Sequence, residues 1–191
     1  MKIIGLTGLI GSGKTTAGAM LKEKGLPVFD ADAVVHDMMD SHEKMIAAFR
    51  KHLPFCVVND CIDRKILAEK VATGDVNVKK LEKIIYPFLK TLRDDFLRQN
   101  STQKAVVLDV PLLFEARWNE ICDVIIMMTA PEDVLKQRVM NRSFMNEKKY
   151  DALRRRQTSA EEKAGKSTYV VDSSKGYDFV RKSLDRILED I

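Results

Sequence analysis

Short apolar runs and longer segments with helical spacing follow one another along the chain. Five apolar runs predict buried strands: 3–6, 28–29, 105–110, 124–128 and 169–172. Between them, apolar positions recur mostly at helical spacing, and strands that alternate with helices are typical of a mostly parallel sheet. The pattern therefore predicts an α/β protein in which helices cover both faces of such a sheet, as in a three-layer sandwich.

The stretch from about 36 to 100 contains no strong strand pattern. Helical spacing covers most of this region in four segments: 34–53, 64–71, 78–88 and 89–98. Turn-forming residues at 59–63 and at Gly74-Asp75 separate these segments, and Pro87 divides the last two. We expect this stretch to form a helical lobe inserted into the α/β core.

The last third of the chain predicts three more helices. Pro131 and the acids after it suit the first turn of a helix that runs to about Arg142. A polar segment follows, and residues 151–163 again have helical spacing. A turn at 173–176 then leads into a C-terminal helix.

The strongest chemical signal is the segment Gly8–Thr15, which matches the phosphate-binding pattern G-x-x-x-x-G-K-[ST] in full. It lies between a predicted strand and a predicted helix, as the motif requires. Glycines let backbone N–H groups turn inward as an anion-binding nest, and the helix N-terminus adds positive potential. We expect ATP contacts from eight residues: Gly8, Ile10, Gly11, Ser12, Gly13, Lys14, Thr15 and Thr16.

Acidic side chains follow two predicted strands, at the edge where open α/β sheets bind ligands. Asp32 can accept the proton of a substrate hydroxyl and orient that oxygen for attack on the γ-phosphoryl; helix capping is the alternative. For Asp30 we favour capping or substrate positioning. Asp109 is predicted to hold Mg²⁺ with the Thr15 hydroxyl, and Glu115 is the alternative acid.

Arg138 and Arg142 lie four residues apart on one face of a predicted helix, beside the polar segment. Guanidinium groups at this place can clamp the transferring phosphoryl as part of a closing lid. Both arginines are therefore predicted to be catalytic, together with Lys14 and Asp32. Solvated surface arginines are the competing interpretation.

Composition adds limits to this picture. The chain has 191 residues, of which 45% are apolar, so it is globular. A net charge of +4 without long blocks of like charge argues against a nucleic-acid partner. Cys56, Cys61 and Cys122 form no C-x-x-C pair, and we expect free thiols. No apolar stretch reaches membrane-spanning length and no signal peptide precedes the loop, so we expect a cytoplasmic protein without a membrane partner. We also expect a monomer or a weak homo-oligomer.

The order of these motifs resembles that of the dephospho-CoA kinase family. The resemblance rests on the following segments and residues: Gly5–Thr16, Asp30–Asp32 with His36, Ile62–Leu67, Asp109–Glu115, Arg138 with Arg142, Gln157 and Glu161–Lys163. It extends from residue 3 to about 176. The phosphate loop is generic, whereas its combination with the Asp-Ala-Asp and Pro-Leu-Leu-Phe-Glu segments is specific to the family.

This resemblance implies transfer of the γ-phosphoryl of ATP, with Mg²⁺, to the ribose 3′-hydroxyl of dephospho-CoA, the last step of CoA biosynthesis. It implies that Asp32 is the base, Lys14 the phosphate anchor and Thr15 a Mg²⁺ ligand. Substrate contacts are expected from six residues: Asp32, His36, Arg64, Leu113, Phe114 and Glu115.

The resemblance also implies one domain of the P-loop NTPase type. Its core covers about 1–35, 101–137 and 164–191, with a CoA-binding lobe at about 36–100 and a lid at about 138–163. Four residues depart from the family pattern: Leu9 in place of Gly, Tyr86 in place of His, Ser143 in place of Asp and Ser173 in place of Asn. None of them belongs to the predicted catalytic set, so we predict an active enzyme.

Two alternatives remain open. Another nucleoside or nucleotide kinase with the same core would bind a nucleoside monophosphate and leave dephospho-CoA unchanged. A non-catalytic sensor of nucleotide or CoA would bind ATP without turnover. A regulatory GTPase is disfavoured, because no Asn precedes a Lys and because Leu112, three residues after Asp109, replaces the glycine that such proteins need.

Overall fold

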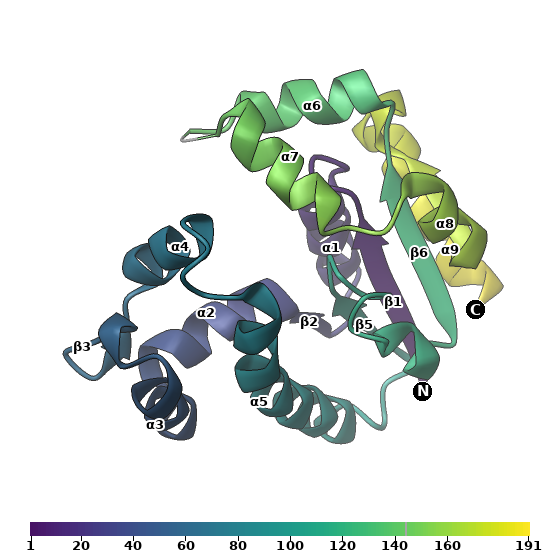
Figure 1. Ribbon diagram of the computed structural model, residues 1–191. Helices are drawn as coiled ribbons and strands as arrows, with labels where there is room; N and C mark the ends of the chain where they lie inside the picture. The colour runs from purple at the N-terminus through teal and green to yellow at the C-terminus, as the bar shows by residue number, and fades with distance from the viewer. Residues whose placement is uncertain (144) are drawn as a thin grey trace. The chain divides into compact units, whose positions relative to one another are not determined.

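The computed structural model describes residues 1–143 and 145–191 (Figure 1). The chain forms two compact units. One comprises Met1–Phe29 and Asn100–Ile191, and the other comprises Asp30–Gln99. The first contains most of the sheet and the phosphate loop, and the second is mainly helical.

The central sheet has five strands in the order β2 (Val28–Asp30), β5 (Ala105–Asp109), β1 (Lys2–Gly8), β6 (Val124–Thr129) and β7 (Tyr169–Asp172). Strand β1 pairs in parallel with β5 and with β6, and β6 pairs in parallel with β7. All five residues of β5 are buried, as is typical of a parallel strand covered on both faces. The predicted mostly parallel α/β sheet is confirmed.

Five helices of the first unit accompany this sheet: α1 (Lys14–Glu23), α6 (Glu132–Met140), α7 (Glu147–Arg155), α8 (Ala160–Lys166) and α9 (Tyr177–Asp190). Two short 3-10 helices lie at Trp118–Ile121 and Ser173–Lys175. The segment 151–163 was predicted as one helix, and this was wrong. Helix α7 ends at Arg155, and Ser159 caps α8 by accepting a hydrogen bond from the Glu162 N–H at 3.1 Å.

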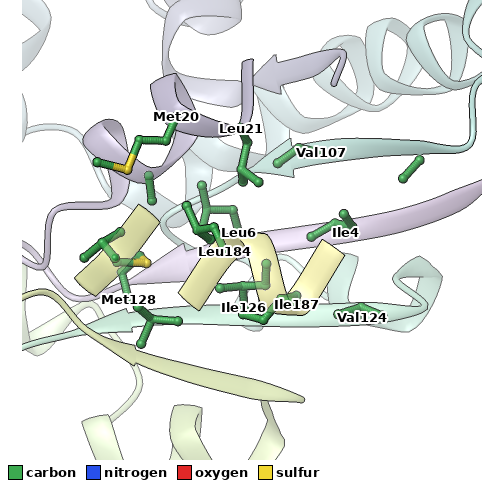
Figure 2. Packing of buried hydrophobic residues seen from close by; sticks show 14 residues of the cluster. Ile4, Leu6, Met20, Leu21, Val107, Val124, Ile126, Met128, Leu184 and Ile187 are labelled. Atoms are coloured by element: carbon green, nitrogen blue, oxygen red, sulfur yellow. The ribbon is translucent and has the colours of Figure 1, made fainter. Parts of the chain in front are cut away.

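Helices α1 and α9 cover one face of the sheet, as Figure 2 shows. The labelled side chains of this cluster are Ile4, Leu6, Met20, Leu21, Val107, Val124, Ile126, Met128, Leu184 and Ile187. Met127 points the other way because side chains alternate along a strand, and it packs with Leu9 and Leu135. Helices α6 and α8 contribute to that second cluster, so the sheet is the middle of three layers.

The second unit contains α2 (Ala31–Ser41), α3 (Glu43–His52), a 3-10 turn (Pro54–Cys56), β3 (Val57–Val58), β4 (Cys61–Ile62), α4 (Arg64–Ala72) and α5 (Val78–Gln99). The predicted helix 34–53 is two helices, because His42 leaves the helical conformation and its Nδ1 accepts the Met45 N–H at 3.2 Å. The β3–β4 hairpin was not predicted. Asn59 and Asp60 form its turn with φ of 49° and 59°, the conformation that such two-residue turns need.

Helix α5 runs through Pro87 without ending there, so the predicted division into two helices was wrong. A proline inside a helix removes one hydrogen bond. Ile85 and Leu89 are buried on either side of it, and tertiary burial of an apolar face can maintain a helix against a local defect. Across the described residues, the structure contains no helix with the length and apolar character that crossing a membrane requires.

Candidate functional site

The phosphate loop joins β1 to α1. Gly11 and Gly13 have φ of 87° and 82°, in the left-handed region that favours glycine. Gly13 occupies the cap position of α1 and offers no side chain to the first N–H groups of the helix. Uncapped N–H groups at a helix N-terminus, together with the helix dipole, form an anion-binding site.

Lys14 and Asp109 form an ion pair beside this loop. Lys14 is the first residue of α1, and Asp109 is the last residue of β5 and only 3% exposed. Gly18 leaves room for the carboxylate, because a Cβ at Gly18 would lie 2.8 Å from Asp109 Oδ2. The structure thus brings together two residues that the sequence predicted for phosphate and metal binding.

The other hydroxyls of the loop differ in their surroundings. Thr15 is exposed and Thr16 is half-buried. Ser12 is 1% exposed, and its hydroxyl has no hydrogen-bond partner within residues 1–143 and 145–191. Over the same residues, no three His, Cys, Asp or Glu side chains gather into a group that could hold a metal ion. Thr15 and Asp109 are among the oxygen-bearing side chains that the loop and the end of β5 offer to a divalent cation.

Arg138 of α6 lies against the phosphate loop. Its Nη1 donates to the carbonyl of Gly11 at 3.3 Å and to the hydroxyl of Ser173 at 2.7 Å, and its Nη2 donates to the Ser173 carbonyl at 3.1 Å. Helix α6 is close enough that a Cβ at Gly11 would lie 2.7 Å from the carbonyl oxygen of Leu135. Arg138 is therefore fixed at the loop, and Ser173 is its partner.

Helices α6 and α7 are joined to each other by polar contacts. Glu132 accepts a hydrogen bond from the Tyr150 hydroxyl at 2.5 Å and pairs with Arg154 at 3.2 Å. Lys136 and Glu147 form a second ion pair at 2.8 Å. Burial by itself would raise the pKa of Glu132, but Tyr150 and Arg154 lower it below its ordinary value. Helices α6 and α7 therefore form one polar-linked hairpin, and the predicted lid at about 138–163 begins within α6.

Arg142 and Ser143 lie between these two helices and are exposed. Within the described part of the chain, Arg142 makes none of the Arg138 contacts with Gly11 and Ser173, although both arginines belong to the same predicted pair. The two arginines thus occupy different settings: Arg138 is held at the phosphate loop, and Arg142 lies on the surface of the segment that connects α6 to α7.

The segment after β5 holds the candidate acceptor residues Leu113, Phe114 and Glu115. Leu113 is fully buried, and its Cδ2 lies 2.8 Å from where a Cβ at Gly5 would stand. Its side chain therefore belongs to the core. Phe114 is half-buried, with the ammonium of Lys163 6.0 Å from the centre of its ring.

Glu115 is engaged inside the protein. One of its oxygens accepts the Thr158 N–H at 2.7 Å and pairs with Lys163 at 3.2 Å. Lys163 is fully buried and also donates to the Pro111 carbonyl at 3.0 Å. Burial by itself would raise the pKa of Glu115, but the Thr158 N–H and Lys163 hold it below its ordinary value of 4.5. Burial lowers the pKa of Lys163, against the opposing effect of Glu115.

The candidate residues of the second unit stand at the beginnings of helices. Asp30 caps α2 by accepting the Ala33 N–H at 3.0 Å, so the cap is Asp30 and not Asp32. Asp32 lies in the first turn and is exposed, and His36 is exposed one turn later. Arg64, the first residue of α4, is also exposed.

Three residues that the structure connects to the candidate site were not among the predicted site residues. Gln157 and Lys163 entered only through the family resemblance, and Ser173 only as a departure from the family pattern. Gln157 bonds the phosphate-loop backbone, Lys163 holds Glu115, and Ser173 holds Arg138. Each contact joins residues more than 30 positions apart, so no local pattern marks it.

Comparison with known proteins gives a consistent family. The family model described as dephospho-CoA kinase matches residues 2–178. A dephospho-CoA kinase of Rhodopseudomonas palustris strain HaA2 is 36% identical over 191 residues, covering 99% of this chain and 95% of the relative. A dephospho-CoA kinase of Nitrobacter winogradskyi is 38% identical over 192 residues, covering 98% and 94%.

Solved structures agree with the fold. A crystal structure of a Thermus thermophilus protein superposes with a TM-score of 0.82 at 31% identity, covering all of this chain and 97% of the other. A dephospho-CoA kinase of Campylobacter jejuni superposes with a TM-score of 0.67 at 21% identity, covering 99% and 96%. At that identity, the second likeness supports the fold alone.

Proposed function

The chain belongs to the dephospho-CoA kinase family, and we propose that its phosphate loop and Asp32 serve the two substrates of that family's reaction. It is an ATP-dependent kinase that transfers the γ-phosphoryl of ATP to the ribose 3′-hydroxyl of dephospho-CoA and so forms CoA. The observation that carries the assignment of residues is the Lys14–Asp109 pair beside a complete phosphate loop.

The phosphate loop binds the triphosphate of ATP in this proposal. The N–H groups at the start of α1 and the left-handed Gly11 and Gly13 support that role, because they form the anion nest on which such loops depend. Lys14 leaves its bond to Asp109 and extends to the β- and γ-phosphates. Its positive charge then offsets the charge that develops on the transferring group.

Thr15 and Asp109 would hold Mg²⁺ at the end of the phosphate loop. The donor set fits, since a hydroxyl and a carboxylate are hard oxygen ligands and Mg²⁺ in kinase sites uses few protein groups. The missing Cβ at Gly18 supports this assignment, because it leaves the space that the Asp109 carboxylate occupies. When bound, the ion neutralises negative charge on the phosphate oxygens.

Asp32 accepts the proton of the 3′-hydroxyl of dephospho-CoA. The hydroxyl oxygen forms a bond to the γ-phosphorus of ATP, and the bond from that phosphorus to the β–γ bridging oxygen breaks, so ADP leaves. Two features support this role: Asp30 already caps α2, and the Asp32 carboxylate is exposed in the first turn. His36 and Arg64 contact the acceptor.

The two arginines of the predicted lid have different proposed roles. Arg138 already contacts the Gly11 carbonyl and is proposed to hold the loop and the transferred phosphoryl together. Arg142 is exposed and is proposed to reach the phosphoryl group when substrates bind. Phe114 contributes to the acceptor site, and Glu115 and Leu113 shape that segment from inside the protein.

A cytoplasmic enzyme, either a monomer or a weak homo-oligomer, completes the proposal. Three cysteines without disulfides in the described structure support a reducing compartment. Size-exclusion chromatography with light scattering at two protein concentrations measures the oligomeric state. A stable larger assembly would contradict this part of the proposal.

The deciding experiment offers dephospho-CoA, AMP, CMP and adenosine separately with ATP and Mg²⁺, and measures ADP release and product mass. We expect ADP release with dephospho-CoA alone and a product with the mass of CoA. Turnover of AMP, CMP or adenosine without CoA formation would retain the kinase and reject the acceptor. ATP binding without turnover of any acceptor would indicate a sensor instead.

A further inference from the structure

Gln157, which lies within the predicted lid at about 138–163, contacts the phosphate loop. It lies two residues beyond the end of α7, and its side-chain amide makes two hydrogen bonds to the loop backbone. Its Oε1 accepts the Ile10 N–H at 3.0 Å, and its Nε2 donates to the Gly8 carbonyl at 3.4 Å. One amide group therefore pairs with both backbone groups that flank Leu9, as a neighbouring strand would.

These bonds matter because the loop has few contacts of its own. Within it, the Ser12 N–H donates to the Leu9 carbonyl at 3.0 Å, and the Gly11 carbonyl is held from outside by Arg138. In a planar trans peptide, a carbonyl and the N–H that follows it point in opposite directions. Fixing the Gly8 carbonyl therefore also fixes the direction of the Leu9 N–H, and phosphate binding depends on such directions.

The apolar side of the same loop is fixed to the same part of the chain. Leu9 is 3% exposed and packs with Met127 and Leu135, and Ala160 and Ala164 of α8 pack against this cluster. The loop is thus attached through an apolar side chain and through a polar amide. Both attachments lead to the segment that begins with α6 and ends with α8.

Gln157 is itself held in place. The next residue, Thr158, donates its N–H to Glu115, and the buried Lys163 pairs with that carboxylate. Neighbouring residues 157 and 158 therefore contact the phosphate loop and the segment after β5. The amide of Gln157 is in consequence presented by a fixed backbone, and the ordering entropy of its contacts with the loop is small.

We propose that Gln157 is a positioning residue for ATP, which holds the phosphate loop in its nucleotide-binding shape and connects the loop to the segment between α7 and α8. The inference rests on the proposed function of the loop in ATP binding. The proposed role differs from a merely stabilising one. A stabilising Gln157 would satisfy two backbone groups, and its loss would lower the stability of the protein without changing the nucleotide affinity of the folded form.

The test compares Q157M with Q137M. Methionine is close to glutamine in size but cannot replace its hydrogen bonds, and Gln137 is an exposed glutamine on α6. Isothermal titration of MgADP measures affinity, and initial rates give kcat and the two KM values. For Q157M we expect the Kd for MgADP and the KM for ATP to rise about tenfold. The KM for dephospho-CoA should stay within about twofold of the wild-type value. Q137M should match wild type throughout.

A second variant keeps the question answerable if Q157M folds poorly. Q157N retains the amide and shortens its reach by one methylene, so we expect weaker MgADP binding with little change in the thermal midpoint of the ligand-free protein. Wild-type MgADP affinity in the folded variants, even with a lowered thermal midpoint, would overturn the proposal. Failure of the wild-type protein to bind MgADP would instead refute the kinase function itself.

Discussion

The two units of the molecule fix their candidate residues by different means. In the first unit, Lys14 and Arg138 are held by partners from distant parts of the chain, namely Asp109 and Ser173. In the second unit, Asp32 is held by its place in a helix that begins with its own cap. Long-range contacts therefore shape the nucleotide side, and local helix starts present the acceptor-side residues.

This difference has a consequence for how each side responds to mutation. A residue at the start of a capped helix keeps its backbone position when its side chain changes, so its removal deletes chemistry and leaves structure. A residue in a long-range pair leaves its partner buried without it, so its removal also affects stability. Mutations on the two sides should separate activity from stability accordingly.

The largest effect is expected for D32A. Loss of the general base should lower kcat about a thousandfold, within the range that general base catalysis contributes, while MgATP binding remains within about twofold of wild type. Initial rates and MgATP titration measure the two quantities. D37N, an exposed acid later on α2, is the matched control and should retain activity. Equal loss of turnover and MgATP affinity in D32A would remove Asp32 from the role of base.

E115Q, in contrast to D32A, is expected to lower the stability of the folded protein. Because the folded pKa of Glu115 is lowered, its ionised form contributes stability that is complete above 4.5 and is lost as the pH falls through the folded pKa. Replacement by Gln should lower the free energy of unfolding at pH 7 by about 1–3 kcal/mol, since the buried Lys163 then lacks its counter-charge.

The pH profile sharpens this prediction. Urea unfolding between pH 7 and pH 3 should show that the wild-type protein loses stability below about pH 4.5 more steeply than E115Q does. E162Q is the matched control, because Glu162 lies next to Lys163 on α8 and forms an exposed pair with Lys166 at 2.6 Å. Exposed pairs of this kind contribute little to stability. Parallel acid profiles for E115Q and the wild type would show that the Glu115–Lys163 pair does not act as described.

A smaller effect, on activity, is expected for G18A. The new Cβ would lie 2.8 Å from Asp109 Oδ2, so the carboxylate must move away from its place beside Lys14. The Mg²⁺ concentration that gives half-maximal rate should rise about tenfold, as expected if a Mg²⁺ ligand is displaced. In G165A, on α8, the new Cβ meets no described residue within 4 Å beyond its own helix turn, and this variant should match wild type in Mg²⁺ dependence. An unchanged Mg²⁺ requirement in G18A would argue against Asp109 as a ligand.

The same contrast explains what the sequence could predict. Strands β1, β5 and β6 are near-continuous apolar runs, and the phosphate loop is a local pattern, so these were predicted from neighbouring residues alone. The contacts of Gln157 and Lys163 depend on which distant segments pack together. Local periodicity carries no information on those contacts, because each contact joins residues that are far apart in the sequence and meet only in the folded protein.

The errors in secondary structure have several origins. Pro87 is a local signal for a helix end, but burial of Ile85 and Leu89 overrides it. The β3–β4 hairpin was missed because its strands have two residues each, too few for alternation to be recognised. In both cases, packing or turn geometry decides the outcome.

The smallest effect concerns the cap that presents Asp32. D30A removes the acceptor for the Ala33 N–H and should lower the free energy of unfolding by about 1 kcal/mol. Because Asp32 lies in the turn that this cap begins, kcat should fall severalfold. D63A removes the corresponding cap of α4, which accepts the Lys65 and Ile66 N–H groups at 2.9 and 3.1 Å, and should cost similar stability. Because Arg64 binds the acceptor in the proposal but takes no proton, D63A should raise KM for dephospho-CoA and leave kcat unchanged.

A rescue variant separates the two roles left open for Asp30. Serine is also a good N-cap, so D30S should restore stability in urea unfolding whichever role is correct. If capping alone explains the loss in D30A, D30S also restores kcat. If stability returns and kcat does not, Asp30 contacts the acceptor directly, and the second unit then presents two neighbouring carboxylates to its substrate. In that case the difference between the two units would not hold for Asp30, because the residue that forms the local cap of α2 would also contact the substrate.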